Sequence, residues 1–455
     1  MTLAHHSGFK LREEREELGL SQAKLSEISG VPQHILSAFE LGKTELPKPE
    51  LDKLRLVFDS DDSLKEIIKR KKRYKKHEYT KKDRDVSRVE KHKPSAGNLE
   101  YRNIIGNLSA KEEAANYSAI SLFSGCGGFS LGFSWAGVKV KGFLELDNAL
   151  SKMYSANFPE AMRLGSDITA VSDQAIQDAH KSIGDIDFII GGPPCQGFSL
   201  SGKRDVNDPR NLLFKHYLRF VDVFKPKVAV IENVRLLTSM KNSAGKLVKD
   251  EIRDEFIAHG YEVNFYEINA KDYGVPEHRE RVIFVAVRSD LKKHPSFPKT
   301  THGHDKQPYR TFADACSDLA YLESGEKSKD ALHSAVNHPK HVLDWLWDVI
   351  EGYSAHDNAD PSMRPPSGYN TTYKRQIWSE PAATVQTTFG MISGCRNVHP
   401  IATRSLTIRE AARIQSFPDD YKFVGTQGVI RTGIGNAVPP LLAHAIAIHI
   451  TSSIL

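Results

Sequence analysis

The sequence predicts a doubly wound α/β domain that carries a second, smaller domain, together with a small all-α domain at the N-terminus. Three observations lead to this fold class. Apolar strand-like segments alternate with helical patterns from Tyr117 to about Arg288, as in a parallel sheet covered by helices. The alternation is lost in residues 289–403, which are rich in Pro, His, Asp and Ser, and helical order returns in residues 404–455. Residues 1–64 contain only short amphipathic helical patterns.

The composition is that of a soluble protein of several domains. Of the 455 residues, 40% are hydrophobic and 26% are charged, and no apolar run reaches membrane-spanning length. The N-terminus contains no apolar stretch that could act as a secretory signal. The four cysteines form no CxxC pair, which argues against structural zinc and against a disulfide framework. We therefore expect a cytoplasmic protein without a metal or a membrane partner.

The N-terminal domain is predicted to consist of short helices separated by turns. Ser21 and Gln22 mark a helix start, Gly30 marks a turn, and Pro32 opens the next helix, where its missing N–H costs nothing. The run LREEREELGLSQAKLSEISGVPQHILSAFELGKTELP resembles the phage-repressor-like (Cro/C1-type) helix-turn-helix family.

This resemblance implies that the domain binds DNA with its second helix in a major groove. The residues that it implies in DNA contact are Gln22, Gln33, His34 and Ser37. Arg15 and Glu40 match a buried ion pair that ties helices together in this family. The alternative is a helical dimerisation domain that does not touch DNA, because the glutamates of EEREE in the first helix would repel phosphates.

A short basic segment follows the N-terminal domain. Residues 1–64 carry a net charge of −4, whereas residues 65–93 carry +9. Such a block suits contact with nucleic acid phosphates, and a solvated linker is the alternative. The predicted domain boundaries are 1–64 for the helix-turn-helix domain, 65–116 for a basic linker, 117–288 and 404–455 for the α/β domain, and 289–403 for the smaller domain.

The α/β domain begins with a strand, a glycine turn and a helix start. The strand candidates are the segments AISLF, VKGFLEL, DFIIGG, VAVIEN, VNFYEINA and RVIFVAV. The loop in Ser121–Phe133, SLFSGCGGFSLGF, leaves room for an adenosine-bearing ligand. Glu145 ends the next strand, where a carboxylate can bind ribose hydroxyls, and Asp167 ends another segment. Because the loop contains no basic residue, a cofactor such as S-adenosylmethionine suits it better than one with a phosphate tail.

Three further side chains lie at predicted strand ends of the same sheet. Cys195 stands in IGGPPCQGFS, where two prolines restrict the backbone directly after an apolar strand. Glu232 ends VAVIEN, where a carboxylate is costly to bury without a partner or a function. Arg279 and Arg281 open the strand RVIFVAV. A thiol, a carboxylate and an arginine therefore converge on one edge, although a lone cysteine is as often structural as nucleophilic.

Five motifs occur in the order found in DNA (cytosine-5)-methyltransferases. They are LFSGCGGFSLGF, PPCQGFS, IENV, HRER and GIGNAVPP, and the resemblance covers Ile120 to the C-terminus except a variable stretch after Arg288. It implies a methyltransferase sheet with S-adenosylmethionine as the cofactor and duplex DNA as the partner. The implied cofactor-binding residues are Phe123, Gly125, Gly127, Glu145, Asp167, Pro194 and Asn436.

The resemblance also implies a covalent mechanism. The thiolate of Cys195 adds to carbon 6 of cytosine, which makes carbon 5 nucleophilic enough to take a methyl group. Glu232 binds the ring at N3, and Arg281 with Arg279 holds the carbonyl oxygen. Loss of the carbon 5 proton then releases the thiol. The target base must be flipped out of the duplex first, at a cost of a few kcal/mol.

Two positions depart from the family pattern, and one region is variable. Glu277 stands where the family usually has glutamine, and Leu146 stands where an aromatic residue often packs on adenine. Residues 289–403 match the place of the family's target-recognition domain. Its candidate DNA contacts are Tyr369, Tyr373, Lys374, Arg375 and Trp378, each of which could equally belong to the core or the solvated surface. Cys126, Cys316 and Cys395 match no catalytic position and are expected to be structural.

The resemblance implies a DNA (cytosine-5)-methyltransferase, the modification enzyme of a restriction-modification system. The N-terminal domain suggests that the enzyme also regulates transcription. Two alternatives remain open at this point. One is an RNA cytosine-5 methyltransferase, because one branch of the same fold modifies tRNA. The other is a DNA-binding regulator with an inactive methylase fold.

Overall fold

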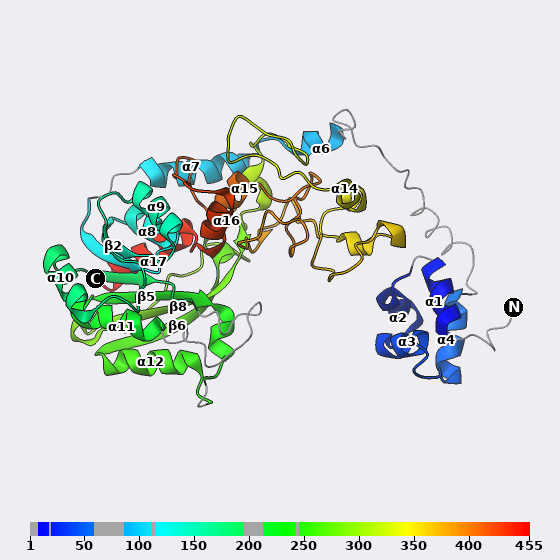
Figure 1. Cartoon of the computed structure of the whole chain (residues 1–455), viewed down its shortest axis with the longest axis horizontal. Coiled ribbons are helices and arrows are strands. Elements are labelled where there is room, and N and C mark those ends of the chain that lie inside the picture. The colour runs from blue at the N-terminus through cyan, green and yellow to red at the C-terminus, as the bar shows by residue number, and fades with distance from the viewer. Residues whose placement is uncertain (1–7, 18–19, 59–85, 111–113, 195–212, 243–244) are drawn as a thin grey trace. The chain divides into compact units, whose positions relative to one another are not determined.

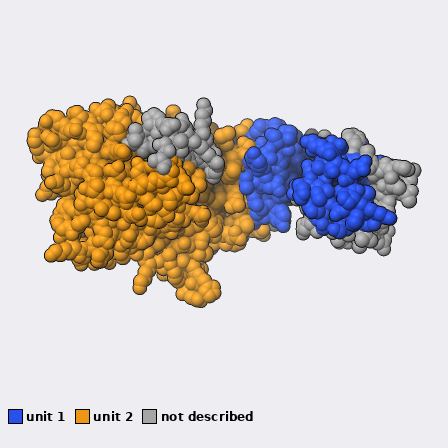
Figure 2. Space-filling view, turned by 90° about the horizontal axis from the view of Figure 1, so that it is seen from below, with its two compact units in different colours: residues 1–84, 338–374 blue, residues 85–337, 375–455 orange. Residues whose placement is uncertain are grey.

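The computed structural model describes residues 8–17, 20–58, 86–110, 114–194, 213–242 and 245–455. The chain forms two units, one of Met1–Arg84 with His338–Lys374 and one of Asp85–Asn337 with Arg375–Leu455 (Figure 2). The larger unit contains the whole sheet. The segment His338–Lys374, which lies inside the predicted 289–403 region, groups with the smaller unit.

The larger unit is built on a seven-stranded sheet, which confirms the predicted α/β fold (Figure 1). Every neighbouring pair is parallel except the two pairs made by β8, which runs antiparallel between β5 and β6. In spatial order the strands are β3 (Met162–Gly165), β2 (Val138–Leu144), β1 (Tyr117–Leu122), β4 (Phe188–Gly191), β5 (Val228–Val234), β8 (Glu280–Arg288) and β6 (Tyr261–Asn269). A separate parallel pair joins β7 (Glu277–His278) to β9 (Ala382–Ala383).

Helices cover both faces of the sheet because successive strand residues point to opposite sides. In β4, Ile189 packs in a core with α10, α11 and α12, whereas Phe188 and Ile190 pack in a core with α8 and α17. The bounds of these covering helices are α8 (Gly128–Trp135), α10 (Asp173–Ile183), α11 (Leu213–Phe224), α12 (Val248–Ala258) and α17 (Pro440–Ser453). Burial on both faces explains the continuous apolar runs of the sequence.

The order of the strands places a switch point beside β1. Leu122 at the end of β1 pairs with Leu144 of β2 on one side and with Gly191 of β4 on the other. Chain connections leave this point in opposite directions, so the carboxyl ends of β1 and β4 separate to form a crevice. Ligands of open α/β sheets bind at such a point.

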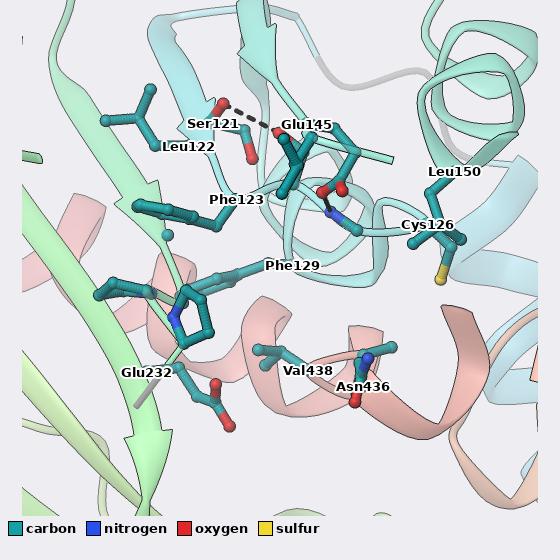
Figure 3. A pocket seen from close by; sticks show the side chains of 18 of the residues that line it. Ser121, Leu122, Phe123, Cys126, Phe129, Glu145, Leu150, Glu232, Asn436 and Val438 are labelled. Carbon is teal, nitrogen blue, oxygen red and sulfur yellow. Dashed lines mark hydrogen bonds between the residues drawn. The ribbon is translucent and has the colours of Figure 1, made fainter. Parts of the chain in front are cut away.

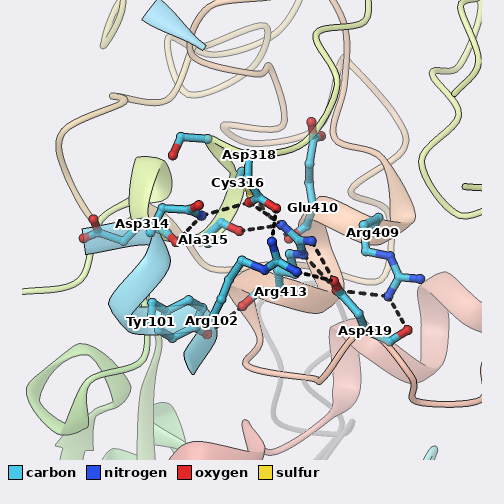
Figure 4. A network of polar contacts seen from close by, with 12 residues as sticks. Tyr101, Arg102, Asp314, Ala315, Cys316, Asp318, Arg409, Glu410, Arg413 and Asp419 are labelled. Atoms are coloured by element: carbon cyan, nitrogen blue, oxygen red, sulfur yellow. Dashed lines mark hydrogen bonds and ion pairs between the residues drawn. The ribbon is translucent and has the colours of Figure 1, made fainter. Parts of the chain in front are cut away.

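A third core lies beside the sheet and includes residues of the segment predicted as a linker. Tyr101 and Ile105 of α7 are buried against Phe312 and Cys316 of α13 and against α15. Asn98 donates to the carbonyl of Asp314, and Arg102 pairs with Asp318 within a network of charged groups (Figure 4). Residues 96–110 therefore belong to the folded body. The helices of this region are α6 (Val86–Lys91), α7 (Ala96–Ala110), α9 (Asn148–Asn157), α13 (Phe312–Cys316), α15 (Ile408–Ile414) and α16 (Gln427–Asn436).

The described N-terminal residues form four helices with a core of their own, as predicted for a helix-turn-helix domain. Leu11, Leu25, Leu36 and Leu54 are fully buried in it. Its helices are α1 (Gly8–Glu17), α2 (Gln22–Ser29), α3 (Gln33–Glu40) and α4 (Lys48–Phe58). The expected ion pair is present: Nε of Arg15 lies 2.6 Å from Oε1 of Glu40, and both side chains are buried.

The remaining elements are short. They are α14 (Lys340–Leu346) and the 3₁₀ helices Arg235–Ser239, Ala270–Tyr273, Ser289–Leu291, Ala355–Asp357 and Pro361–Met363. One described stretch, Gln427–Ser453, is long and apolar enough to cross a membrane by length and composition, but 67% of its apolar window is buried in the protein. Among the described residues, no group of three or more His, Cys, Asp or Glu is placed to hold a metal ion.

Candidate active site

A cavity of about 730 Å³ opens at the carboxyl ends of β1, β2, β4 and β5 (Figure 3). It lies at the switch point of the sheet. Most of the residues predicted to bind cofactor or cytosine line this cavity. They are Phe123, Gly125, Glu145, Asp167, Pro194, Glu232, Arg279, Arg281 and Asn436. Asn436 comes from α16, at the far end of the chain. Cys195 follows Pro194 directly but lies outside the described residues.

The glycine loop and Glu145 are bound to each other. Oε2 of Glu145 accepts the backbone N–H of Gly125 at 2.7 Å, and Oε1 accepts the N–H of Asp147 at 2.9 Å. Burial raises the pKa of the Glu145 carboxyl, although these hydrogen bonds act in the opposite direction. A carboxylate has about four acceptor positions, so two N–H donors leave room for ligand hydroxyls.

Gly127 does not line the cavity but shapes the loop from behind. It caps α8 with a φ of 99°, a conformation that favours glycine. A Cβ at this position would lie 2.6 Å from the hydroxyl oxygen of Tyr421 and 2.8 Å from a ring carbon of Phe158. The Tyr421 hydroxyl also donates to the carbonyl of Cys126. Gly127 therefore allows the helix start to approach the loop closely.

Asp167 and Leu146 lie at the exposed side of the cavity. Oδ1 of Asp167 accepts the hydroxyl of Thr169 at 2.7 Å and its backbone N–H at 2.9 Å. These hydrogen bonds lower the pKa of Asp167, so it is ionised at neutral pH. Leu146 is 66% exposed, although it lines the cavity with an apolar side chain. An exposed leucine there offers an apolar surface to a ligand.

Glu232 and Arg281 form the charged side of the cavity. They lie on the neighbouring strands β5 and β8, and Nε of Arg281 is 2.7 Å from Oε1 of Glu232. Both side chains are largely buried, with 14% of Arg281 and 12% of Glu232 exposed. Next to Glu232, Asn233 donates to the carbonyl of Pro193 at 2.8 Å. The end of β5 thus holds the segment that leads into Cys195.

Arg279 has different partners from Arg281. Its Nη2 donates to the carbonyl of Gly435 at 3.0 Å and its Nη1 to that of Val385 at 3.4 Å. Burial, followed by the charge of Arg281, lowers the pKa of Arg279 to about 10. Burial also raises the pKa of Glu277, which lies beside it. The two arginines of HRER therefore differ: Arg281 pairs with Glu232, whereas Arg279 pairs with Glu277 and donates to two backbone carbonyls.

The cavity also contains residues that the sequence did not single out. Asn233 belongs to IENV, so its position in that motif was an available signal. Thr387 and Thr432 also line the cavity, but no local sequence pattern around them indicates a ligand site. Val438 belongs to GIGNAVPP, and Gly128 packs so tightly on it that a Cβ would lie 2.5 Å from the Val438 carbonyl oxygen.

In the N-terminal domain, three of the four predicted DNA-contacting residues lie on α3. Gln33 and His34 are exposed, and Ser37 is partly exposed. Gln22, at the start of α2, donates instead to Oε2 of Glu40 at 2.8 Å. Its side chain thereby joins the ion pair that ties the helices together.

A doubly wound sheet with a cavity of about 730 Å³ at its switch point, and a paired carboxylate and arginine at its strand ends, fits the class of methyltransferase that the motifs indicate. The family described as C-5 cytosine-specific DNA methylase matches residues 117–452, and the helix-turn-helix family matches residues 11–62. The chain therefore belongs to the C-5 cytosine-specific DNA methylases, and it is a DNA cytosine-5-methyltransferase with a helix-turn-helix domain.

Similar proteins agree with this assignment. The Type II methyltransferase M.DdeI of Desulfomicrobium norvegicum is 36% identical over 371 residues, which cover 73% of this chain and 88% of that protein. M1.HphI of Haemophilus parahaemolyticus, also a Type II methyltransferase, is 39% identical over 333 residues, which cover 72% of this chain and 85% of that protein. The solved structure of a prophage-encoded E. coli protein has the same fold, with a TM-score of 0.60 at 24% identity, covering 74% of this chain and 99% of that one.

Proposed function

We propose that the enzyme transfers a methyl group from S-adenosylmethionine to carbon 5 of cytosine in a specific duplex DNA sequence, as the modification enzyme of a Type II restriction-modification system. The observation that carries this proposal is the Glu232–Arg281 pair, 2.7 Å apart at the strand ends next to the segment that leads into Cys195. The similarity to two Type II methyltransferases supports the role in restriction-modification.

The acceptor groups and the apolar surface of the cavity suit S-adenosylmethionine. Glu145, buried and held by two backbone N–H groups, can accept the ribose hydroxyls, and Asp167 and the apolar Leu146 lie on the more exposed side for the adenine. Among the described lining residues the lysine and arginine side chains are Arg279 and Arg281, and both have partners within the protein. This favours a cofactor without phosphates. When bound, it supplies an electrophilic methyl group at the sulfonium.

The protein's own residues divide the chemistry of cytosine between them. The thiolate of Cys195 forms a bond to carbon 6, and the displaced electron pair makes carbon 5 nucleophilic. Glu232, carrying a proton when cytosine is bound, donates a hydrogen bond to N3, while Arg281 holds the carbonyl oxygen against the charge that develops. After methylation, the proton on carbon 5 passes to water, its bonding pair re-forms the double bond between carbons 5 and 6, and the bond between carbon 6 and sulfur breaks, which restores the thiolate.

Conversion sequencing of DNA from cells that express the chain tests this proposal. We expect methylcytosine in one recurring short sequence, its loss in Cys195→Ala, and its retention in Cys395→Ala, a matched change at an exposed cysteine. Methylation that survives in Cys195→Ala would mean that the nucleophile lies elsewhere. If the DNA is unmethylated but tRNA takes up methyl label from S-adenosylmethionine, the RNA enzyme is favoured. If neither DNA nor tRNA is methylated, an inactive regulator is favoured.

A second function is proposed for the N-terminal domain, which would repress transcription, including that of its own operon. The exposed Gln33 and His34 on α3 support this role, because amide and imidazole groups on a recognition helix read base edges. In a promoter reporter assay, Gln33→Ala combined with His34→Ala is expected to relieve repression while genomic methylation persists. Loss of both activities would contradict two separable functions.

A further inference from the structure

Glu277 and Arg279 form an ion pair that is buried next to the cavity. Their side chains are 0% and 1% exposed, and Nη1 of Arg279 lies 3.5 Å from Oε1 of Glu277. Such a pair is costly to bury unless both members also have good hydrogen-bond partners. The partners of the two side chains therefore indicate what the pair does.

Both members hold the same backbone residue, Val385. Oε1 of Glu277 accepts the Val385 N–H at 2.6 Å, and Nη1 of Arg279 donates to the Val385 carbonyl at 3.4 Å. The parallel pairing of Glu277 with Ala382 in β7 and β9 brings this segment alongside. The peptide groups on both sides of Val385 are thus fixed by one ion pair.

Arg279 also holds a second segment, at the end of α16. Its Nη2 donates to the carbonyl of Gly435 at 3.0 Å. Gly435 packs directly on the first segment, because a Cβ there would lie 2.4 Å from the backbone nitrogen of Thr387. Thr387 and Asn436 line the cavity. Each lies within two residues of a carbonyl to which Arg279 donates, that of Val385 or of Gly435. Arg279 therefore connects two chain segments that meet in the cavity wall.

We propose that Arg279 is a positioning residue and that, together with Glu277, it sets the part of the cavity wall formed by Thr387 and Asn436. Both of its Nη atoms donate to backbone carbonyls, whereas the contact with Glu232 is made by Arg281. This inference rests on the proposed function, because it assigns the positioned wall to the binding of S-adenosylmethionine.

The carboxylate of Glu277 compensates the buried charge of Arg279. Changing Glu277 alone to glutamine keeps an acceptor for the Val385 N–H but leaves the buried guanidinium without its ion-pair partner. Changing both residues to glutamine removes the unpaired charge as well. The two substitutions are therefore expected to be coupled: the double variant should lose less affinity than the two single losses combined.

The test is a double-mutant cycle on the full chain. Affinity for S-adenosylhomocysteine is measured by calorimetry, and kcat and KM for S-adenosylmethionine by methyl transfer to duplex DNA, for Glu277→Gln, Arg279→Gln and the double variant. We expect Arg279→Gln to weaken binding and raise KM about tenfold, with a smaller fall in kcat, because a displaced wall affects the ligand that it touches. Arg279→Lys, which keeps the charge, is expected to recover part of the affinity.

Arg288→Gln provides a matched control. Arg288 ends the same strand, β8, and pairs with Asp290 at the surface, so its substitution is expected to leave binding and KM unchanged. A lower kcat with unchanged KM and affinity in Arg279→Gln would overturn the proposal, and so would strictly additive losses in the cycle. If Arg279→Gln fails to fold, Arg279→Lys provides the same comparison of KM with kcat. Absence of S-adenosylhomocysteine binding by the unaltered chain would contradict the proposed function, and the inference would fall with it.

Discussion

At the scale of single residues, the proposed site pairs a carboxylate with a guanidinium on neighbouring antiparallel strands. Glu232 and Arg281 lie near the paired ends of β5 and β8, where Val234 is opposite Arg281. Their contact of 2.7 Å gives each group a partner before any substrate is bound. The pair can therefore present a fixed pattern of donors and acceptors to the edge of a cytosine.

Glu232→Gln tests this pair. The amide keeps the size of the side chain but removes its acid–base function, so we expect kcat for methyl transfer to fall roughly 100-fold. Glu280→Gln is the control, because Glu280 is exposed and pairs with Arg235 outside the cavity. Steady-state kinetics with duplex DNA gives both values, and an unchanged kcat in Glu232→Gln would exclude the proposed role.

Gly127→Ala tests the close approach behind the glycine loop. With a φ of 99° and Tyr421 in the space for a Cβ, alanine is expected to reduce the free energy of unfolding by about 2 kcal/mol. Gly106 in α7 is exposed, and a Cβ added to it would meet no atom within 4 Å, so Gly106→Ala should stabilise by about 1 kcal/mol. Urea unfolding measures both, and equal effects of the two changes would contradict this account.

At the scale of elements, the segment before α7 is held by an aromatic cluster. The ring of His92 lies 5.1 Å from that of Trp378 and 5.8 Å from those of Tyr321 and His399, measured between ring centroids. His92 is 8% exposed, and its two ring nitrogens have no hydrogen-bond partner among the described residues. It therefore packs as a neutral ring.

This packing makes stability depend on pH. Burial lowers the pKa of His92 to about 4, so the unfolded chain binds more protons than the folded chain between about pH 6.5 and 4. The neutral ring contributes fully to the free energy of unfolding above pH 6.5. This contribution decreases as the pH falls, by about 3 kcal/mol near pH 4. His92→Phe is expected to lose less stability between pH 7 and 4.5, as thermal unfolding at each pH would show. Identical losses in both proteins would mean that His92 does not titrate as described.

At the scale of the whole molecule, the boundary of the catalytic body lies within the predicted linker. The Tyr101 hydroxyl donates to the carbonyl of Arg413 at 2.8 Å, and Asn98 is fully buried. The part of the predicted linker that contains α7 thus covers α13 and α15. Local charge patterns do not reveal such packing, because it depends on residues more than 200 positions away in the sequence.

Truncations test this boundary. A chain that begins at residue 86 is expected to fold with nearly the Tm of the larger unit in the full-length chain and to methylate DNA. A chain that begins at residue 114 loses the buried Tyr101 and Ile105 and is expected to have a much lower Tm, because the removal of one large buried side chain alone costs about 3 kcal/mol. Equal stability of the two truncated chains would place α7 outside the cooperative core.

Much of the catalytic fold could be predicted because its signals are local. Strands buried on both faces produce apolar runs, and glycines and prolines mark the turns between them. The cavity residues Phe123, Gly125, Glu145 and Glu232 come from such strand ends, and their order along the chain matches the family motifs. The sequence by itself therefore determined the class of fold, the class of reaction and most of the residues at the carboxyl edge of the sheet.

Only the tertiary structure decided how distant segments complete the site. It separates Arg279, which holds Val385 and Gly435, from its neighbour Arg281, which pairs with Glu232, although the two are only two residues apart. It also brings Thr387 into the cavity wall. The physical reason is that a motif specifies backbone conformation and side-chain type over a few residues, whereas hydrogen-bond partners are selected by packing between segments that are far apart in the sequence.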